Sequence, residues 1–466
     1  MKMKRMTAML CAGMLACSGA VAAVLEPCAV FADGENEEEK KAWDGSYDTS
    51  WYDAQDTELH IFSASELAGL AYLVNSGGKT FEGQTVYLES DVDLAGAKWT
   101  PIGQSDGHET TKNNGTFKGA FDGNNHTVSN LTCLPNDHWL SKAGLFGCCS
   151  AGTIKNLSLE NCHTSGLANG CICSYLFDGG VIENCKVTGI LENGEWSVGG
   201  IVGIMVDSSV KNCFADISIN SLASTADNYV SGAGGICGKI RGSSMIDGCI
   251  SSGTILRSIT HDESQPASKR PYSIVGGICG CSADADDRVA VNNWVVKNSC
   301  SHCSLEAISS KYSNGKYENY FYGIAGGIVG RAVNGATLEN VYNTGEVKCT
   351  GIAQGVIGKT EQETQIINAY YLSSTAASGG GYGEDACIAK SATNMKKEAF
   401  AQSLGDAFVF QENSFPRLLW ETQTAEIVTG DVSGDGKIGA DDAQFILQYY
   451  VNHLAGKDIP WKDIVS

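Results

Sequence analysis

Apolar residues recur along residues 115–382 with a period much longer than that of one helix or strand. One motif reads apolar-x-Asn-x, as in Ile154-Lys155-Asn156-Leu157. The spacings between successive motif asparagines are 26, 28, 28, 36, 50, 42 and 28 residues, so a base period near 28 with insertions accounts for all of them. The motif positions are Asn130, Asn156, Asn184, Asn212, Gly248 in a degenerate copy, Asn298, Asn340 and Asn368.

A second motif, Gly-x-x-Gly, precedes most copies of the first. The last glycine lies 9 or 10 residues before the next motif asparagine position, except once, where the interval is 18. A repeat of this length that holds two or three short β segments predicts one coil of a parallel β-solenoid, whose apolar side is buried only by stacking on its neighbours. The motif occupies residues 144–147, 200–203, 235–238, 277–280, 327–330 and 355–358.

The residue types of the two motifs have physical reasons. We expect the Ile and Val of the first position to stack as an inward-facing ladder. Asn suits a turn because it tolerates left-handed backbone, and stacked Asn side chains can hydrogen-bond along a column. Gly permits tight corners and close backbone approach. The position after Asn is small or apolar, which favours Cys185, Cys213 and Cys249 as core residues.

The Gly-[Ile/Val]-x-Gly and Asn-Cys pairs resemble those of the GLUG-repeat family of secreted bacterial proteins, over roughly residues 115–372. The resemblance implies coils of a right-handed parallel β-helix. GLUG repeats occur in adhesin-like and surface proteins, and the family implies no single activity.

Both ends of the repeat region carry signals of a capped solenoid. Ser63-Ala-Ser-Glu66 is typical of a capping box that opens a helix, and Gly77-Gly78 would end it. Strands are expected at residues 86–88 and 92–94. We therefore predict an all-β parallel β-helix at residues 115–382, an N-terminal cap with first strands at 33–114, and a C-terminal cap at 383–421 with a helical stretch from Met395 to Leu404.

Residues 1–32 combine a basic start with a weakly apolar stretch and small residues before Asp33, which predicts a secretory signal peptide. An uncleaved anchor and lipidation at Cys17 are the alternatives. No later stretch is long and apolar enough to predict a membrane span. The net charge of −21 argues against nucleic acid as a partner, and 43% hydrophobic with 18% charged residues argues against bulk disorder.

Sixteen of the 19 cysteines follow the signal segment. In a secreted chain cysteines often form disulfides, but several of these occupy repeat positions that predict buried free thiols. Free thiols are the favoured interpretation, and some disulfides stay possible. A zinc site at residues 171–173 or 300–303 is disfavoured, because a one-residue gap between cysteines is not the usual ligand spacing.

The most specific chemical pattern lies at residues 431–442. Calcium in a tight loop takes six to eight oxygen ligands, and Gly436 at position 6 would permit the sharp turn. The following residues have helical apolar spacing. The predicted Ca²⁺ ligands are Asp431, Ser433, Asp435, the carbonyl oxygen of Lys437, and Asp442.

This loop and the helix after it resemble one repeat of a type I dockerin over residues 429–453, within a module at 429–466. The resemblance implies calcium-dependent binding to a cohesin module on a scaffold protein. Gly439 replaces the usual Asn or Ser of the family, and no second repeat follows. Ala440 and Asp441 occupy the positions that contact cohesin in the family. Simple solvent exposure of these two residues is the favoured interpretation, and a cohesin-contacting role is the alternative.

No acid–base or nucleophile constellation stands out among the eight histidines or the acidic residues. Insertions near residues 220–230, 256–273, 282–293 and 308–320 should gather on one face, often the binding face of a solenoid. Tyrosines in the last insertion could contact a glycan or simply pack the loops. The acidic cluster at residues 284–287 is more simply a solvated loop than a second calcium site.

These features favour a secreted, extracellular or cell-surface-associated, non-catalytic binding or adhesion protein. Its partners would be a carbohydrate or cell-surface ligand and, through the dockerin-like module, a cohesin-bearing scaffold. The alternative is an extracellular polysaccharide-degrading β-helix enzyme, a lyase or glycoside hydrolase, carried by the same module. A third interpretation is a structural surface repeat whose calcium loop only stabilises its end.

Overall fold

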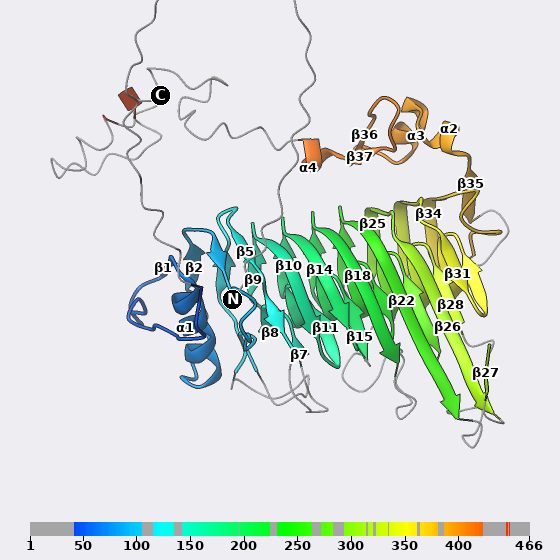
Figure 1. Ribbon diagram of the computed structural model, residues 1–466. Helices are drawn as coiled ribbons and strands as arrows, with labels where there is room; N and C mark the ends of the chain where they lie inside the picture. Colours follow the sequence, from blue (N-terminus) through cyan, green and yellow to red (C-terminus); the bar gives the residue numbers. More distant parts are fainter. Residues whose placement is uncertain are drawn as a thin grey trace, which may run out of the picture. The chain divides into compact units, whose positions relative to one another are not determined.

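The computed structural model shows coils of parallel β-strands stacked along one axis (Figure 1). It describes residues 42–104, 115–134, 142–194, 196–223, 231–262, 272–282, 293–313, 316–319, 323–333, 335–360, 364–380, 386–422, 444, 445 and 447. The described strands form one 21-stranded sheet, two seven-stranded sheets and a small two-stranded sheet. The prediction of an all-β fold with long parallel sheets is confirmed.

The two seven-stranded sheets form two walls of the stack, and every neighbouring pair in them is parallel. Parallel pairing follows because each strand bonds to the equivalent strand one coil away. One sheet holds β7 (Lys142–Ala143), β11 (Ala168–Gly170), β15 (Ser197–Gly199), β19 (Ala233–Gly234), β23 (Ser273–Gly276), β28 (Gly323–Gly326) and β32 (Ile352–Gln354). The other holds β8 (Phe146–Ser150), β12 (Cys173–Phe177), β16 (Val202–Val206), β20 (Cys237–Arg241), β24 (Cys279–Ser282), β29 (Val329–Ala332) and β33 (Ile357–Thr360).

The 21-stranded sheet supplies the remaining strands of each coil. Its first strands are β1 (Glu58–Ile61), β2 (Thr85–Leu88), β3 (Val92–Asp93), β4 (Ala120–Asp122), β5 (Thr127–Ser129) and β6 (Thr132–Cys133). The strands that contain or precede the motif asparagines are β9 (Thr153–Lys155), β13 (Val181–Glu183), β17 (Ser209–Lys211), β21 (Met245–Asp247), β25 (Val295–Ser301), β30 (Thr337–Asn343) and β34 (Gln365–Leu372). The others are β10 (Ser158–Ser165), β14 (Lys186–Glu192), β18 (Phe214–Ala223), β22 (Ile250–Asp262), β26 (Ser304–Ser313), β27 (Lys316–Asn319), β31 (Val347–Cys349) and β35 (Cys387–Lys390).

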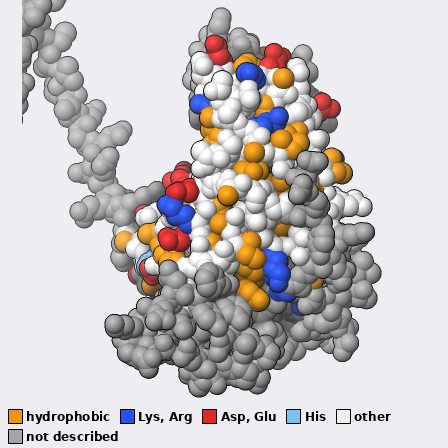
Figure 2. Space-filling model, turned by 90° about the vertical axis from the view of Figure 1, so that its right-hand side faces the viewer, with side chains coloured by type: hydrophobic (Ala, Val, Ile, Leu, Met, Phe, Trp, Pro, Cys, Tyr) orange, Lys and Arg blue, Asp and Glu red, His pale blue; other side chains and the backbone are white. Residues whose placement is uncertain are grey.

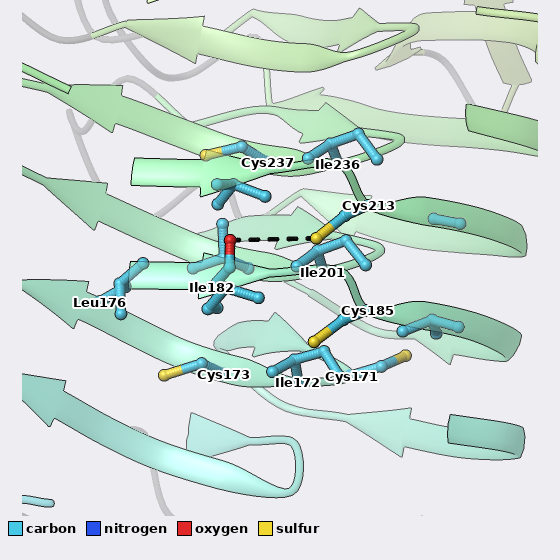
Figure 3. Packing of buried hydrophobic residues seen from close by; sticks show 14 of the residues in the cluster. Cys171, Ile172, Cys173, Leu176, Ile182, Cys185, Ile201, Cys213, Ile236 and Cys237 are labelled. Atoms are coloured by element: carbon cyan, nitrogen blue, oxygen red, sulfur yellow. Dashed lines mark hydrogen bonds between the residues drawn. The ribbon is translucent and has the colours of Figure 1, made fainter. Parts of the chain in front are cut away.

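The apolar residue of the first motif forms the predicted inward ladder. Ile182 pairs in register with Ile154 on one side and Val210 on the other, and all three are fully buried. A second ladder comes from Ile201 and Ile236 of the glycine motif and from Ile172, at the equivalent place in a coil that lacks the motif, and the three lie one above another (Figure 3). Burial of this kind stabilises a fold by about 25 cal/mol per Å² of apolar surface, and it is available only when the coils stack.

The motif asparagines make the predicted column of left-handed turns. All seven have positive φ, from 47° at Asn298 to 57° at Asn130, and Gly248 takes the same conformation with φ of 66°. Along the column the Asn184 amide donates to Asn156 Oδ1 at 3.2 Å. The Asn340 amide donates to Asn298 Oδ1 at 3.2 Å in the same way. The column therefore fixes the turn in each coil and bonds neighbouring coils together.

The glycines of the second motif are required by close approach between coils. A Cβ added to Gly235 would lie 2.2 Å from the carbonyl oxygen of Gly277, which is far inside van der Waals contact. A Cβ on Gly277 would lie 2.0 Å from the carbonyl oxygen of Gly327. A side chain at either position would separate neighbouring coils.

All 16 cysteines after residue 32 are free thiols, and 14 of them are buried. Cys185, Cys213 and Cys249 have no exposed surface, and their thiols donate hydrogen bonds to main-chain carbonyl oxygens. For example, Cys213 Sγ donates to Lys211 O at a distance of 3.1 Å. Cys185 and Cys213 lie in adjacent coils in Figure 3. Burial raises the pKa of Cys149 to about 12, so its reactive thiolate is scarce at neutral pH.

Helix α1 (Ala64–Asn75) follows β1, in the place where the sequence predicts a helix. Ser63 Oγ accepts a hydrogen bond from Glu66 N at 3.3 Å, and Glu66 Oε2 accepts one from Phe62 N at 2.6 Å. The buried face of α1 includes Leu67, Leu70 and Val74, which belong to the same apolar core as the coils. Figure 1 places α1 beside β1 and β2, at the end of the stack where the described chain begins.

Residues 386–422 first add β35 to the last described coil, where it pairs with β34. The chain then forms α2 (Ala392–Met395), α3 (Glu398–Ser403), the antiparallel pair β36 (Phe408–Val409) and β37 (Arg417–Leu418), and α4 (Leu419–Thr422). We call residues 391–422 the C-terminal strap. The stretch predicted as a cap thus runs back along the side of the stack, since Trp420 Nε1 donates to Gly248 O at 2.8 Å.

The strap covers a row of side chains that point out of the 21-stranded sheet. The row comprises Ile250, Cys300, Tyr342 and Tyr370, which are in register on neighbouring strands. Apolar strap residues complete this second core, namely Met395, Phe400, Leu404, Phe408 and Leu418. Among the residues that the structure describes, none of the helices has the length and apolarity needed to cross a membrane.

Candidate functional site

The residues predicted to bind calcium lie outside the described part of the chain. This holds for Asp431, Ser433, Asp435, Lys437 and Asp442, and also for the signal segment at residues 1–32. Of the stretch expected to be helical after the loop, Gln444, Phe445 and Leu447 are described, and all three are helical. The calcium site therefore stays a prediction from the sequence.

The insertions are described only in part. Strands β22 and β26 extend into them, and β26 folds back on β27 as an antiparallel hairpin. The side chains of Tyr312 and Tyr317 lie outside the described set, as do Lys269, Arg270 and the acidic cluster at residues 284–287. Tyr272 is described, and Lys359 Nζ lies 5.4 Å from the centre of its ring.

The described histidines occupy separate places. His60, His126 and His163 each pair with one carboxylate, at 2.7 Å from Glu89, 3.1 Å from Asp91 and 3.1 Å from Glu192. Within the described ranges, no three His, Cys, Asp or Glu side chains come together in a way that could hold a metal ion.

His302 is half-buried beneath the C-terminal strap. Its Nε2 lies 3.7 Å from Cys300 Sγ, its Nδ1 pairs with the Thr344 hydroxyl, and its ring lies 5.8 Å from that of Tyr342. Burial lowers the pKa of His302 to about 4 and raises that of Cys300 to about 12. Both groups are therefore neutral at pH 7, which suits packing and hydrogen bonding rather than nucleophilic catalysis.

On the described part of the face in Figure 2, hydrophobic side chains are scattered over the surface, and charged side chains lie in a few small groups. Ile352, Ile367 and Ile388, which belong to the last described coils, are among the exposed apolar residues of the chain.

A hollow beside α1 brings four aromatic side chains together, and we call it the aromatic pocket. It has a volume of about 180 Å³ and is open to solvent. Its aromatic residues are Trp43, Tyr47, Tyr72 and Trp99, and it is also lined by Gly45, Ala68, Ala71, Asn75, Ser76, Lys98 and Thr100.

Three separate segments build the aromatic pocket, namely residues 43–47, the exposed side of α1 and residues 98–100. The first segment can lie directly against α1 because residue 69 is glycine. A Cβ on Gly69 would lie 1.8 Å from Asp48 O, and Asp48 N donates to Ser65 O at 2.8 Å. One small residue on the helix thus decides whether the pocket forms.

Hydrogen bonds hold the aromatic rings in place. Trp43 Nε1 donates to Ser46 O at 2.9 Å, and Trp99 Nε1 donates to Leu145 O at 3.1 Å, so both indole N–H groups bond within the protein. Their ring centres lie 5.8 Å apart. Tyr47 and Tyr72 stack with centres 4.2 Å apart and an interplanar angle of 11°, and a hydrogen bond with Tyr72 raises the pKa of Tyr47.

The polar groups of the aromatic pocket have two distinct roles. Asn75 shapes its wall, because Oδ1 accepts from Gly103 N at 2.9 Å and Gln104 N at 2.8 Å while Nδ2 donates to Pro101 O at 2.9 Å. Lys98 is exposed and brings the only charge among the described lining residues. A pocket with apolar walls and few polar groups is the usual form of a small-molecule site.

Sequence reasoning missed the aromatic pocket. Its residues follow neither motif of the repeat, and they come together only through packing of the first segment on α1. The available signal was the density of aromatic residues before the first strand, where Trp43, Tyr47, Trp51 and Tyr52 lie within ten residues.

No family model matches this chain. Over 163 residues it is 29% identical to halomucin from Haloquadratum walsbyi, a stretch that makes up 34% of this chain and only 2% of halomucin. The chain therefore spans a very small part of that relative.

Two solved structures are similar to the chain. A candidate immunoglobulin A1 protease from Bacteroides ovatus is 21% identical with a TM-score of 0.49, and the match covers 78% of this chain and 92% of that one. An IgA1 protease is 16% identical with a TM-score of 0.48, covering 76% of this chain and 25% of that one. At these identities and scores, neither likeness carries an activity over to this chain.

Proposed function

We propose that this chain is a secreted, non-catalytic binding protein. In this proposal the β-solenoid is a rigid body that presents a ligand-contacting site, and the C-terminal module binds Ca²⁺ and docks to a cohesin-bearing scaffold or cell surface. The observation that carries the binding role is the aromatic pocket, where the exposed rings of Tyr47 and Tyr72 stack on each other and the indoles of Trp43 and Trp99 are held by hydrogen bonds before any ligand arrives. Such preorganisation lowers the entropic cost of binding.

The docking role is supported by the sequence of the loop at residues 431–442. Asp431, Ser433, Asp435 and Asp442 offer side-chain oxygens at loop positions 1, 3, 5 and 12, and the Lys437 carbonyl oxygen would add a ligand at position 7. Calcium affinity follows from these charged oxygens, and a module of this size depends on its metal to fold.

Calorimetric titration of the full chain with Ca²⁺ tests the metal site. We expect binding of one ion in the wild type and loss of that binding in a double variant, Asp431→Ala with Asp435→Ala. A matched double variant, Asp284→Ala with Asp286→Ala, removes two acidic residues elsewhere and should bind as the wild type does. Equal binding by both double variants would contradict the assigned ligands.

A pull-down against cohesin modules, with and without a calcium chelator, tests docking. Capture that requires calcium and fails for the Asp431/Asp435 variant is the expected result. Capture that ignores the chelator, or no capture of any cohesin, would rule out the docking role.

A further inference from the structure

We propose that the aromatic pocket binds a single sugar ring that carries a carboxylate, a uronic acid unit of an acidic glycan. This inference rests on the proposed binding function and deepens it by naming the class of ligand. It concerns the N-terminal end of the described chain, far in sequence from the predicted calcium module and from the insertions.

The size of the aromatic pocket favours one small ring. Its volume of about 180 Å³ lies below the range of roughly 300–1,000 Å³ typical of sites for drug-sized ligands. A single pyranose is a ligand of suitable size, and a longer glycan would extend from the open side into solvent.

The shape of the walls favours a ring with apolar faces and polar edges. Tyr47 and Tyr72 are 53% and 42% exposed, which is unusual for large aromatic side chains packed beside a core. The indole N–H of Trp43 already bonds within the protein, so this half-buried residue offers a ring face rather than a donor, while Trp99 is only 3% exposed and supports the pocket from the core side. Sugars present C–H groups on their faces and hydroxyls at their rim, where Ser76 and Thr100 also line the pocket.

The charge of the lining decides between sugar classes. Lys98 contributes a positive charge, and no acidic residue is among the described lining residues, although the whole chain carries a net charge of −21. A cation that brings the only charge among the described lining residues complements an anionic ligand. The ammonium of Lys98 is therefore assigned to the carboxylate of the sugar, and the aromatic rings to its faces.

Titration of the full chain with a galacturonic acid trimer, followed by calorimetry and by intrinsic tryptophan fluorescence, to which Trp43 contributes, tests the inference. The buffer contains a calcium chelator, so that no metal bridges the trimer to the protein and the result does not depend on the calcium module. A galactose trimer is the neutral control ligand. We expect the acidic trimer to bind, to bind more weakly as salt rises, and to bind more tightly than the neutral one.

Two substitutions with matched controls locate the site. Tyr72→Ala on the exposed side of α1 should weaken binding about tenfold, as expected for loss of an aromatic face. Phe62→Ala removes an exposed aromatic residue outside the aromatic pocket and should leave binding unchanged. Lys98→Gln should weaken binding of the acidic trimer about two- to fivefold, the usual weight of an exposed ion pair, and Lys186→Gln should not.

Three results would each overturn the inference. They are no binding of the acidic trimer, equal affinity for the two trimers, and equal effects of Tyr72→Ala and Phe62→Ala. Failure of the sugar titration with retained cohesin capture would refute the pocket assignment alone. Binding of the acidic trimer without any cohesin capture would refute the docking role alone. Cleavage of the trimer by the wild type would contradict the non-catalytic role, and Tyr72→Ala would still decide where the sugar binds.

Discussion

The asparagine at the turn of each coil combines two roles in one side chain. Its backbone adopts left-handed conformation, which costs most residues about 1–2 kcal/mol, and its amide bonds to the next coil. Gly248 meets the first requirement but has no amide. There the neighbouring Asp247 carboxylate accepts from the Asn298 amide at 2.8 Å and continues the column.

The two roles separate in a pair of variants at Asn184. Asn184→Gly keeps the left-handed turn and loses only the amide bonds, so we expect a loss of about 1 kcal/mol in the free energy of unfolding. Asn184→Ala loses the bonds and also strains the turn, which should add about 1–2 kcal/mol. Urea unfolding followed by circular dichroism measures both values. Equal losses would show that the left-handed turn contributes nothing.

At the scale of elements, the C-terminal strap and the sheet beneath it form a second core. The Tyr342 hydroxyl donates to Pro416 O, and the Tyr342 ring packs at 5.8 Å from Phe400 and 5.7 Å from Phe408. His302 lies in the same layer, with its ring 6.4 Å from that of Phe415. The strap therefore buries a titratable group at its contact with the stack.

This half-buried histidine makes stability depend on pH. The pKa of His302 is about 4 when folded and about 6.5 when unfolded, so below pH 6.5 the unfolded chain binds a proton that the folded chain excludes. Stability should thus fall as pH drops from about 6.5 to about 4, by up to about 3 kcal/mol. The groups around His302 that can also ionise are Cys300, Tyr342 and, on the strap, Glu421.

The variant His302→Gln provides the control, because Gln is uncharged throughout this range. Urea unfolding measures the free energy of unfolding of both proteins between pH 4 and pH 7. As pH falls over this range, the wild type should lose more of that free energy than the variant does. The pairs formed by His60, His126 and His163 are common to both proteins and cancel in the comparison. Parallel curves would contradict burial of a neutral histidine beneath the strap.

The coils were predictable from the sequence, and the aromatic pocket and the strap contacts were not. The residue types at Ile182, Asn184 and Gly200 recur with a base period near 28 because each position meets equivalent neighbours in every coil, so their roles can be inferred from the repeat alone. The contact of Gly69 with Asp48 and that of Tyr342 with Pro416 each occur once and join segments without a shared pattern. Single contacts of this kind leave no periodic trace in the sequence.

At the scale of the whole molecule, residues 42–422 contain both described cores. A chain that ends after Thr422 should therefore unfold at the same temperature as the full chain. A chain that ends after Lys390 lacks the strap and exposes Ile250, Cys300, Tyr342 and Tyr370 together, so it should melt at a lower temperature and aggregate. Calorimetry and light scattering compare the three chains, and identical behaviour of the two shortened ones would refute a stabilising role for the strap.

The column of asparagines has a consequence for how such a chain can change its length. Asn184 and Asn212 lie 28 residues apart and occupy equivalent places in consecutive coils. Deleting residues 185–212 would join Asn184 directly to Cys213. The new junction would read Asn-Cys, as Asn184-Cys185 does in the present sequence. Gene duplication or loss of one such unit would shift the two ends by one coil and create a single new junction, at which strands with equivalent positions pair in the same register. Relatives of this chain are then expected to differ in length by whole coils, with their terminal structures preserved.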